Sequence, residues 1–257
     1  MVTDMEGNPL RNVNVFVYLN GEEQHVLANG LGKFRATFTT STIGKQIVQV
    51  VYKANKKYFD SEANTTFTVA SVKLVMFKVK PVTYRDNFTI QGKLIDAEGN
   101  IIVGAEVQLN INGETITLIT DKNGRYTYKA KALAVGNFTV TASYIDEETG
   151  VELTATKTLE VTKRAVTLIV DEINDAMLGE ELTITGKLTD DSGTPYKNCN
   201  IFVKVNGEEQ HIKTDNKGIF TCIYTPTTAG TQNVEVRYKG NSNYLGDKVT
   251  TTFEVNA

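Results

Sequence analysis

The sequence predicts an all-β protein built from three copies of one module, and three observations lead to this fold class. Apolar and polar residues alternate in short stretches, as in a strand with one buried face. In residues 199–205 every second residue is apolar: Cys199, Ile201, Val203 and Val205. Turn residues, above all Asn-Gly, interrupt such stretches roughly every 8–12 residues. No segment has the i, i+3, i+4 apolar spacing of an amphipathic helix.

The repeat is visible as identical residues that recur at spacings of 92 and then 94 residues. Gly7, Gly99 and Gly193 open three equivalent segments. Four further sets keep these spacings: Asn20, Asn112 and Asn206; Gly32, Gly124 and Gly218; Gly44, Gly136 and Gly230; Tyr52, Tyr144 and Tyr238. A unit of about 93 residues with about seven short strands is typical of an immunoglobulin-like β-sandwich.

Within the third copy the elements follow in order. The stretch NCNIFVKVNG (198–207) reads as a strand that ends in an Asn-Gly hairpin turn. In TDNKGIFTCIY (214–224) a turn leads into a strand whose Phe220 points inward. VEVRY (234–238) supplies a further strand that ends at the shared tyrosine, and TTFEV (251–255) is the closing strand.

We expect three modules, at residues 1–71, 72–162 and 163–257. The link LEVTKRAVTLIV (159–170) passes from one strand to the next without Gly or Pro, so the modules should form an end-to-end rod rather than a flexible chain. The first copy begins at the counterpart of Leu94, and we expect it to be an N-terminally truncated sandwich inside a longer array. Its open strand edges could support self-association.

Composition argues against several classes of partner. The net charge is −3 and no Lys/Arg cluster occurs, so we expect no nucleic-acid binding. No apolar run reaches the roughly 20 residues that span a bilayer, so we expect no membrane insertion within this segment. The start MVTDMEGN turns polar too early for a secretory signal, so a secreted protein would be longer than this chain.

Residues 186–255 resemble bacterial Ig-like repeats of the group 3 type. The resemblance rests on GKLTDDSGTPYKN, TDNKGIF, TPTTAG and YKGNSNY in the third copy. The first copy keeps TTSTIG and YKANKKYFDS, whereas the second replaces the last motif with YIDEETGVEL. The Asn-, Thr- and Lys-rich style is similar to adhesin-like surface proteins of methanogenic archaea. This resemblance implies an extracellular location at the cell surface or wall, and it implies no catalytic residue.

The stretch NGEEQH occurs twice, at 20–25 and 206–211, and holds both histidines, His25 and His211. A metal or catalytic site needs several groups that converge from different strands. We instead interpret each stretch as a hairpin turn with a solvated outgoing strand. Two Asp-x-x-Gly segments, at 121–124 and 215–218, likewise read as turns rather than calcium loops. We therefore expect no enzyme, metal or cofactor.

Cys199 and Cys222 fall at inward positions, where buried free thiols are expected and a disulfide is the alternative. Asn64, Asn87 and Asn137 begin Asn-x-Ser/Thr triplets and are candidate glycosylation sites.

An exposed contact patch is predicted in the first copy. Because Val15, Val17 and Leu19 face inward, the side chains between them should point outward. The predicted patch is Phe16, Tyr18, Ile47 and Val51. Exposed aromatic groups of this kind can mark a binding surface.

The function that fits best is a non-catalytic adhesin or stalk region whose repeats space or present adhesive surface for cell–cell or cell–substrate attachment. Its partner would be a surface protein or glycan of another cell. The alternative is a set of carbohydrate-binding accessory modules in a larger surface enzyme or fibre, with the exposed aromatics stacking on sugars.

Overall fold

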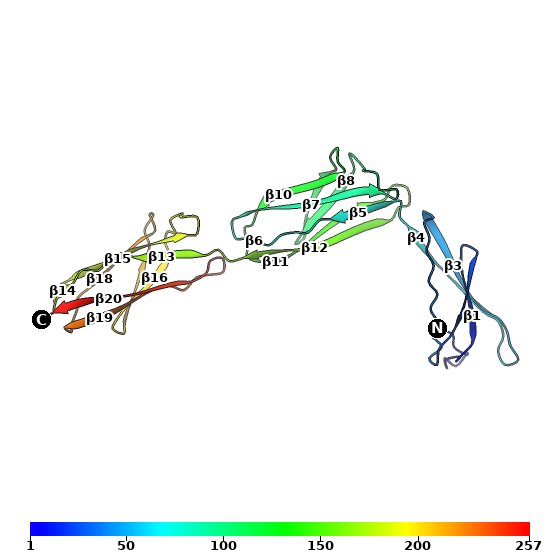
Figure 1. Cartoon of the computed structure of the whole chain (residues 1–257), viewed down its shortest axis with the longest axis horizontal. Coiled ribbons are helices and arrows are strands. Elements are labelled where there is room, and N and C mark those ends of the chain that lie inside the picture. The colour runs from blue at the N-terminus through cyan, green and yellow to red at the C-terminus, as the bar shows by residue number, and fades with distance from the viewer. The chain divides into compact units, whose positions relative to one another are not determined.

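A computed structural model describes all 257 residues, and it contains strands β1 to β20 and no helix (Figure 1). The all-β fold class is confirmed. The structure holds no helix of the length and apolarity needed to cross a bilayer. We refer to residues 1–71, 72–162 and 163–257 as repeats 1, 2 and 3.

Repeat 3 is an eight-stranded immunoglobulin-like sandwich. One sheet has the order β13-β15-β18 and the other β14-β20-β19-β16-β17. The first strand, β13, pairs antiparallel with β15, and the short β14 crosses to the other sheet and pairs parallel with β20. The strands are β13 (Val166–Val170), β14 (Ala176–Met177), β15 (Leu182–Asp190), β16 (Asn200–Val205), β17 (Glu208–Lys213), β18 (Ile219–Tyr224), β19 (Gly230–Tyr238) and β20 (Asp247–Asn256).

The core of repeat 3 lies between these two sheets. Burial alternates along the facing strands, so that β18 buries every second side chain and β16 does the same. Fully buried side chains include Ile184, Leu188, Ile201 and Phe220. Burial of each such side chain contributes about 1.5–3 kcal/mol to the free energy of unfolding. Packing of the two sheets against each other is therefore the main source of stability in repeat 3.

Repeat 2 follows the same plan, with sheets β10-β7-β5 and β6-β12-β11-β8-β9. Here β6 pairs parallel with β12, as β14 does with β20. The strands are β5 (Val72–Met76), β6 (Val82–Thr83), β7 (Asn87–Asp96), β8 (Glu106–Ile111), β9 (Glu114–Ile119), β10 (Arg125–Lys131), β11 (Gly136–Ile145) and β12 (Glu152–Thr162).

Repeat 1 has one sheet where the other repeats have two. Its order is β2-β1-β3-β4, made from β1 (Asn14–Leu19), β2 (Glu22–Leu27), β3 (Gly44–Tyr52) and β4 (Ser61–Val69). Residues 33–40, which match β10 and β18 in sequence, do not form a strand. Strand β18 pairs with residues 182–187, and of these only Lys187 has an equivalent residue, Met1, in repeat 1. Repeat 1 thus has four strands, whereas repeats 2 and 3 have eight each.

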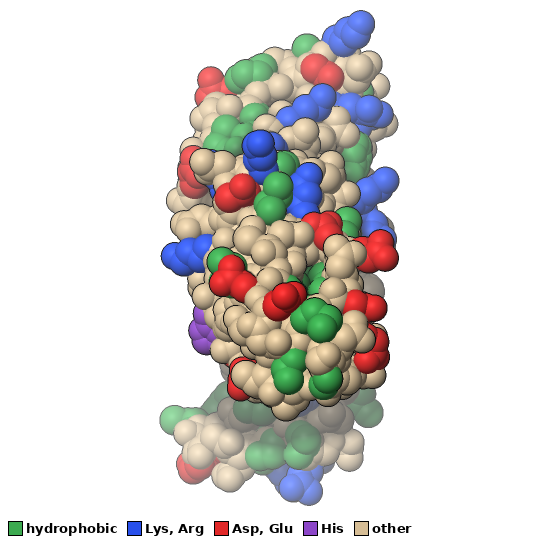
Figure 2. All heavy atoms as spheres, turned by 90° about the vertical axis from the view of Figure 1, so that its left-hand side faces the viewer, with side chains coloured by type: hydrophobic (Ala, Val, Ile, Leu, Met, Phe, Trp, Pro, Cys, Tyr) green, Lys and Arg blue, Asp and Glu red, His purple; other side chains and the backbone are tan.

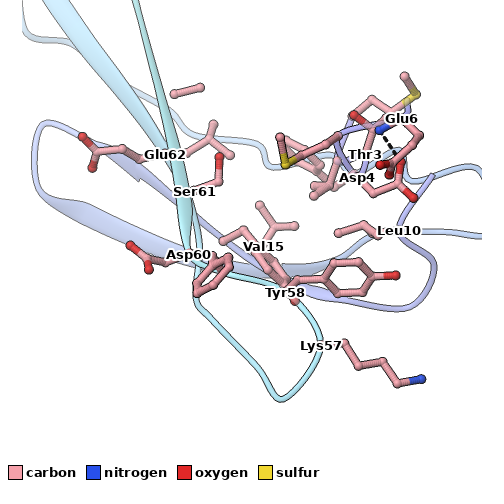
Figure 3. A pocket seen from close by; sticks show the side chains of 18 residues that line it. Thr3, Asp4, Glu6, Leu10, Val15, Lys57, Tyr58, Asp60, Ser61 and Glu62 are labelled. Atoms are coloured by element: carbon pink, nitrogen blue, oxygen red, sulfur yellow. Dashed lines mark hydrogen bonds between the residues drawn. The ribbon is translucent and has the colours of Figure 1, made fainter. Parts of the chain in front are cut away.

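The single sheet leaves inward positions of repeat 1 open. The closing-strand side chain Phe67 is 43% exposed, whereas its equivalent Phe253 in repeat 3 is 4% exposed. A hollow of about 850 Å³ lies on the same side, lined by residues 1–6, 57–63, Leu10, Val15, Phe34, Val50 and Tyr52. In Figure 3 Leu10, Val15 and Tyr58 line it together, and Lys57 points away.

By its contacts the chain divides into two compact units. The first comprises Met1–Phe77, Ile90–Tyr128 and Val140–Lys157, and the second Lys78–Thr89, Lys129–Thr139 and Thr158–Ala257.

Glycine in the Gly-Lys-Leu stretch of repeats 2 and 3 is required by close packing. A Cβ on Gly186 would lie 2.1 Å from the carbonyl oxygen of Ile169 and 2.4 Å from the Phe220 ring. Gly92 is in the same position, against the oxygen of Val75 and the Tyr126 side chain. The Tyr126 hydroxyl donates to that oxygen at 2.9 Å.

We therefore expect Gly186→Ala to destabilise repeat 3 by about 2 kcal/mol or more, because the added methyl overpacks a fully buried ring. The measurement is urea unfolding of the whole chain. Gly30→Ala is the control, since nothing lies within 4 Å of its Cβ position, and it should be nearly neutral. Equal stability of Gly186→Ala and wild type would contradict the packing argument.

Candidate functional site

The outward side of the β2-β1-β3 sheet in repeat 1 carries a cluster built around Phe16. The hairpin pairs Phe16 with His25, and the two rings stack with centroids 4.8 Å apart and planes 5° apart. From the other side, the Lys53 ammonium lies 4.0 Å from the Phe16 ring centroid. The Phe16 ring thus contacts both an imidazole and a cation, and contact of a cation with a ring is favourable for the ring quadrupole.

The four patch residues lie on one face of this sheet. Phe16 is directly opposite Val51, and Tyr18 is opposite Gln49. Ile47 is 54% exposed, whereas the other three are half-buried. Tyr18 also faces Glu23, and a hydrogen bond to that carboxylate raises the pKa of Tyr18. The patch is geometrically continuous, and its role as a contact surface stays a prediction.

Repeat 3 builds the same cluster at equivalent positions. Phe202 pairs with His211, with ring centroids 4.4 Å apart in an edge-on arrangement. The Lys239 ammonium lies 3.7 Å from the Phe202 centroid. Arg237 is opposite Phe202 on β19 and forms an ion pair with Glu209.

Repeat 2 lacks all three members of the cluster. Gln108, Thr117 and Ile145 stand in their places, and the Thr117 hydroxyl donates to Gln108 Oε1 at 2.9 Å. The β8–β9 hairpin keeps the same pairing as the other two hairpins. The fold therefore forms without the cluster, and its presence in repeats 1 and 3 is a property of the surface.

Both histidines are exposed on the outgoing strand of a hairpin. Asn20 and Asn206 have positive φ and are followed by Gly, as a two-residue turn of the expected kind requires. No three His, Cys, Asp or Glu side chains come together to hold a metal ion. The pairing of each histidine with a phenylalanine was missed from the sequence, although a two-residue turn after Leu19 or Val205 dictates it.

A buried glutamine that was also missed supports each of these turns. Gln232 donates to the oxygens of Thr228 and Gly230, and accepts from the Asn206 side chain at 2.6 Å. Gln46 makes the equivalent bonds in repeat 1, and Phe138 occupies this position in repeat 2. The signal was a glutamine two residues after the shared glycine.

The Asp-x-x-Gly segments are turns. Asp121 accepts hydrogen bonds from the backbone of Asn123 and Arg125, and these bonds lower its pKa. Asp215 accepts the same two bonds, from Lys217 and Ile219. The carboxylates are thus satisfied by the turn itself.

The two cysteines are buried and carry free thiols. Cys199 precedes β16 and Cys222 lies in β18, so they belong to opposite sheets. Burial raises the pKa of both thiols. The disulfide between them stays an untested alternative. The three glycosylation candidates, Asn64, Asn87 and Asn137, are all exposed, and their use stays a prediction.

Arg164 follows β12 and joins several segments of the second compact unit. Its backbone accepts from Leu245 N and donates to Asn243 O, both at 2.9 Å. Its Nε donates to the Tyr84 oxygen at 2.7 Å, and its terminal nitrogens form ion pairs with Asp86 and Asp191. The Arg164 side chain is only 9% exposed. Its charge is thus largely removed from water, and carboxylates from two loops compensate for the lost solvation.

Asp146 makes a second anchor, within the first compact unit. Its carboxylate accepts from the backbone N and the hydroxyl of Ser71, at 2.6 and 2.7 Å, and from the Thr149 hydroxyl at 2.7 Å. Burial alone would raise its pKa, but the hydrogen bonds from Thr149, Ser71 and Glu148 outweigh burial and lower the pKa to about 2.

Comparison with known proteins gives one partial family match. Residues 89–168 match the carboxypeptidase regulatory-like domain, which covers most of repeat 2. No curated protein sequence matches the chain. The family that matches is thus not the group 3 family, whereas the coarser assignment, an immunoglobulin-like domain, agrees with the strand order of repeats 2 and 3.

Among solved structures the chain is similar to bacterial adhesins. Against FdeC, an Escherichia coli adhesin, the identity is 16%, with 99% of this chain and 90% of that chain covered and a TM-score of 0.32. Against invasin, a bacterial integrin-binding protein, the identity is 17%, with 99% of this chain and 55% of that chain covered and a TM-score of 0.33. Against a Ca²⁺-stabilised adhesin with which an Antarctic bacterium binds ice, the identity is 16% and the TM-score is 0.30. That match covers 97% of this chain and 66% of the solved chain, so this chain spans about two thirds of the solved chain's length.

Thiol labelling tests the state of the cysteines. We expect Cys199 and Cys222 to resist a thiol reagent in the native protein, because both are buried and their thiolates are disfavoured. In urea without reductant both should react. Two thiols appearing only after reductant is added would instead demonstrate a disulfide.

Asp146→Asn should destabilise the protein at pH 7 by about 1–2 kcal/mol, because the buried hydrogen bonds lose their charged acceptor. Because the pKa of Asp146 is lower in the folded than in the unfolded protein, ionised Asp146 stabilises the wild type fully at pH values above the unfolded-state pKa near 3.9. This stabilisation is lost as the pH falls toward 2. The difference from Asp146→Asn, measured by urea unfolding, should therefore shrink between pH 4 and pH 2. Glu147→Gln, at the exposed neighbour, is the control. A difference that persists unchanged at pH 2 would contradict this account.

Proposed function

We propose that the chain is a non-catalytic region of a cell-surface adhesin or stalk, made of immunoglobulin-like modules at 1–71, 72–162 and 163–257. The modules space or present adhesive surface for attachment to another cell or to a substrate. The partner is a surface protein or glycan, and the location is extracellular, at the cell surface or wall. The resemblance to group 3 repeats and to methanogen surface proteins belongs to this proposal.

The observation that carries the proposal is the Arg164 contact. A spacer must transmit position from one module to the next, and a link of a few residues does so only if side chains restrain it. Arg164 supplies that restraint, because one guanidinium bonds the oxygen of Tyr84, Asp86 and Asp191 at once. The Tyr84 ring also packs edge-on against Tyr244, with centroids 5.5 Å apart.

The surface of the chain supports the same function. Acidic, basic and hydrophobic side chains are interspersed on the face shown in Figure 2. Such a surface stays soluble at high local density, as an array on a cell requires. Because the fold is repeated while its outward face varies, one module can bind a partner and the neighbouring modules can act as spacers.

The test uses beads that carry the chain by its C-terminus, with biotin at the N-terminus, presented to streptavidin beneath a polymer brush. We expect Arg164→Ala to reduce capture several-fold, because a loosened link shortens the mean reach of the chain. Small-angle scattering should show a broader distance distribution for the same variant. Lys163→Ala is the control, since this neighbour is exposed and donates only to the Asn241 oxygen.

Capture and scattering that are identical for Arg164→Ala and wild type would overturn the spacing role. Thermal unfolding is measured in parallel, so that a globally unfolded variant is recognised. Loss of the paired guanidinium should cost about 1–3 kcal/mol, which leaves a folded chain to compare.

A further inference from the structure

One side of the larger sheet in repeat 3 concentrates positive charge. We define the repeat 3 outer face as the solvent side of β17-β16-β19-β20, opposite the core. Its cations come from all four strands, and three carboxylates lie among them. The cations are Lys204, Lys213, Arg237, Lys239 and Lys248, and the carboxylates are Glu209, Glu235 and Glu254.

The three carboxylates already have partners within the face, and Glu254 accepts a hydrogen bond from the Thr231 hydroxyl. Glu209 bonds Arg237 and lies 2.8 Å from His211 Nε2. Glu235 lies 3.5 Å from the Lys248 ammonium and 3.8 Å from Arg237. Lys204, Lys213 and Lys239 form no close ion pair, and only Lys239 is near enough to a carboxylate, that of Glu209, to lower its pKa. The face therefore keeps an excess of positive charge around Phe202.

The aromatic ring fixes part of this charge in place. The Lys239 ammonium is 3.7 Å from the Phe202 centroid, and the Arg237 guanidinium carbon is 5.6 Å from it. A cation held over a ring loses less freedom when an anion binds than a free lysine does. Phe202 thereby preorganises an ammonium at the surface.

A shallow hollow of about 520 Å³ continues the face beyond Lys204. Its side chains offer amides and hydroxyls: Asn206, Asn233, Thr250, Thr251 and Thr252, beside Lys204 and Glu235. Amide and hydroxyl groups both donate and accept, which suits a ligand with many hydroxyls. Register places Lys204 opposite Glu235 and Glu235 opposite Thr250, so charge and hydroxyls form adjacent rows.

The array itself shows that the fold does not require these cations. At the five equivalent positions repeat 2 has Asn110, Ile119, Ser143, Ile145 and Thr154. Repeat 1 has Tyr18, Leu27, Val51, Lys53 and Glu62. Both repeats keep the same pairing of hairpin and central strand without this charge.

We propose that the repeat 3 outer face binds an acidic polysaccharide, a chain of sugars that carry carboxylates. The carboxylates pair with Lys204, Lys213 and Lys239, and the sugar hydroxyls bond the amides and threonines of the hollow. An acidic peptide fits less well, since peptides add to sheets through backbone pairing at an edge, and these groups lie on the face. The inference rests on the proposed function, for which it names the adhesive module and the partner class.

The test is binding of the whole chain to immobilised polygalacturonate, with dextran and polyglutamate as comparison surfaces. The site variant is Lys204→Gln, Lys213→Gln and Lys239→Gln together. The matched variant is Lys187→Gln, Lys197→Gln and Lys217→Gln, which removes the same charge from exposed positions outside the face. We expect the site variant to lose about tenfold in affinity, since each exposed ion pair is worth a few-fold, and the matched variant to lose little.

Added salt should weaken the wild-type interaction with polygalacturonate. Equal losses in both variants would show non-specific attraction and overturn the site. Equal binding to dextran would overturn the role of charge, and equal binding to polyglutamate would overturn the polysaccharide class. No binding to polygalacturonate would overturn this inference alone, because the capture of beads beneath a brush does not depend on the repeat 3 outer face.

Discussion

The closing of one sheet over another is the constraint on which each repeat depends. A strand has apolar side chains on one side only, and that side leaves water only when a second sheet covers it. Repeat 3 shows the closed state, with Phe253 buried among residues of both sheets. Repeat 1 shows what one sheet alone leaves open, in the exposed Phe67 and the hollow beside Val15. The surface features arise on the opposite side, which packing leaves free to vary.

Much of the fold follows from local sequence. Alternation at 199–205 and the Asn-Gly turns predicted the strands and hairpins of repeat 3, because both signals act over a few residues. The same signals fail at residues 33–40, where alternation is present but no partner strand is available. Strand formation there depends on a distant segment, which periodicity does not report.

The candidate site was only partly predictable for the same reason. Phe16 and Tyr18 were recognised as outward-facing by alternation, a local property. His25 was taken as a solvated residue, because its contact with Phe16 requires the hairpin register to be followed across the turn. The role of Arg164 was not predicted, since its partners Asp86 and Asp191 lie 78 and 27 residues away in the sequence.

The Arg164 contact also has a thermodynamic consequence. When residues from neighbouring repeats share one buried guanidinium, unfolding of either repeat removes stabilisation from the other. The position equivalent to Arg164 at the preceding link is Ala70, where the anchor is instead the Ser71 bond to Asp146. The two links therefore differ in the contacts that join neighbouring repeats, with an arginine ion-pair cluster at one and a serine–aspartate hydrogen bond at the other. We therefore expect the coupling between adjacent repeats to differ from one link to the next, because a different residue makes the contact at each.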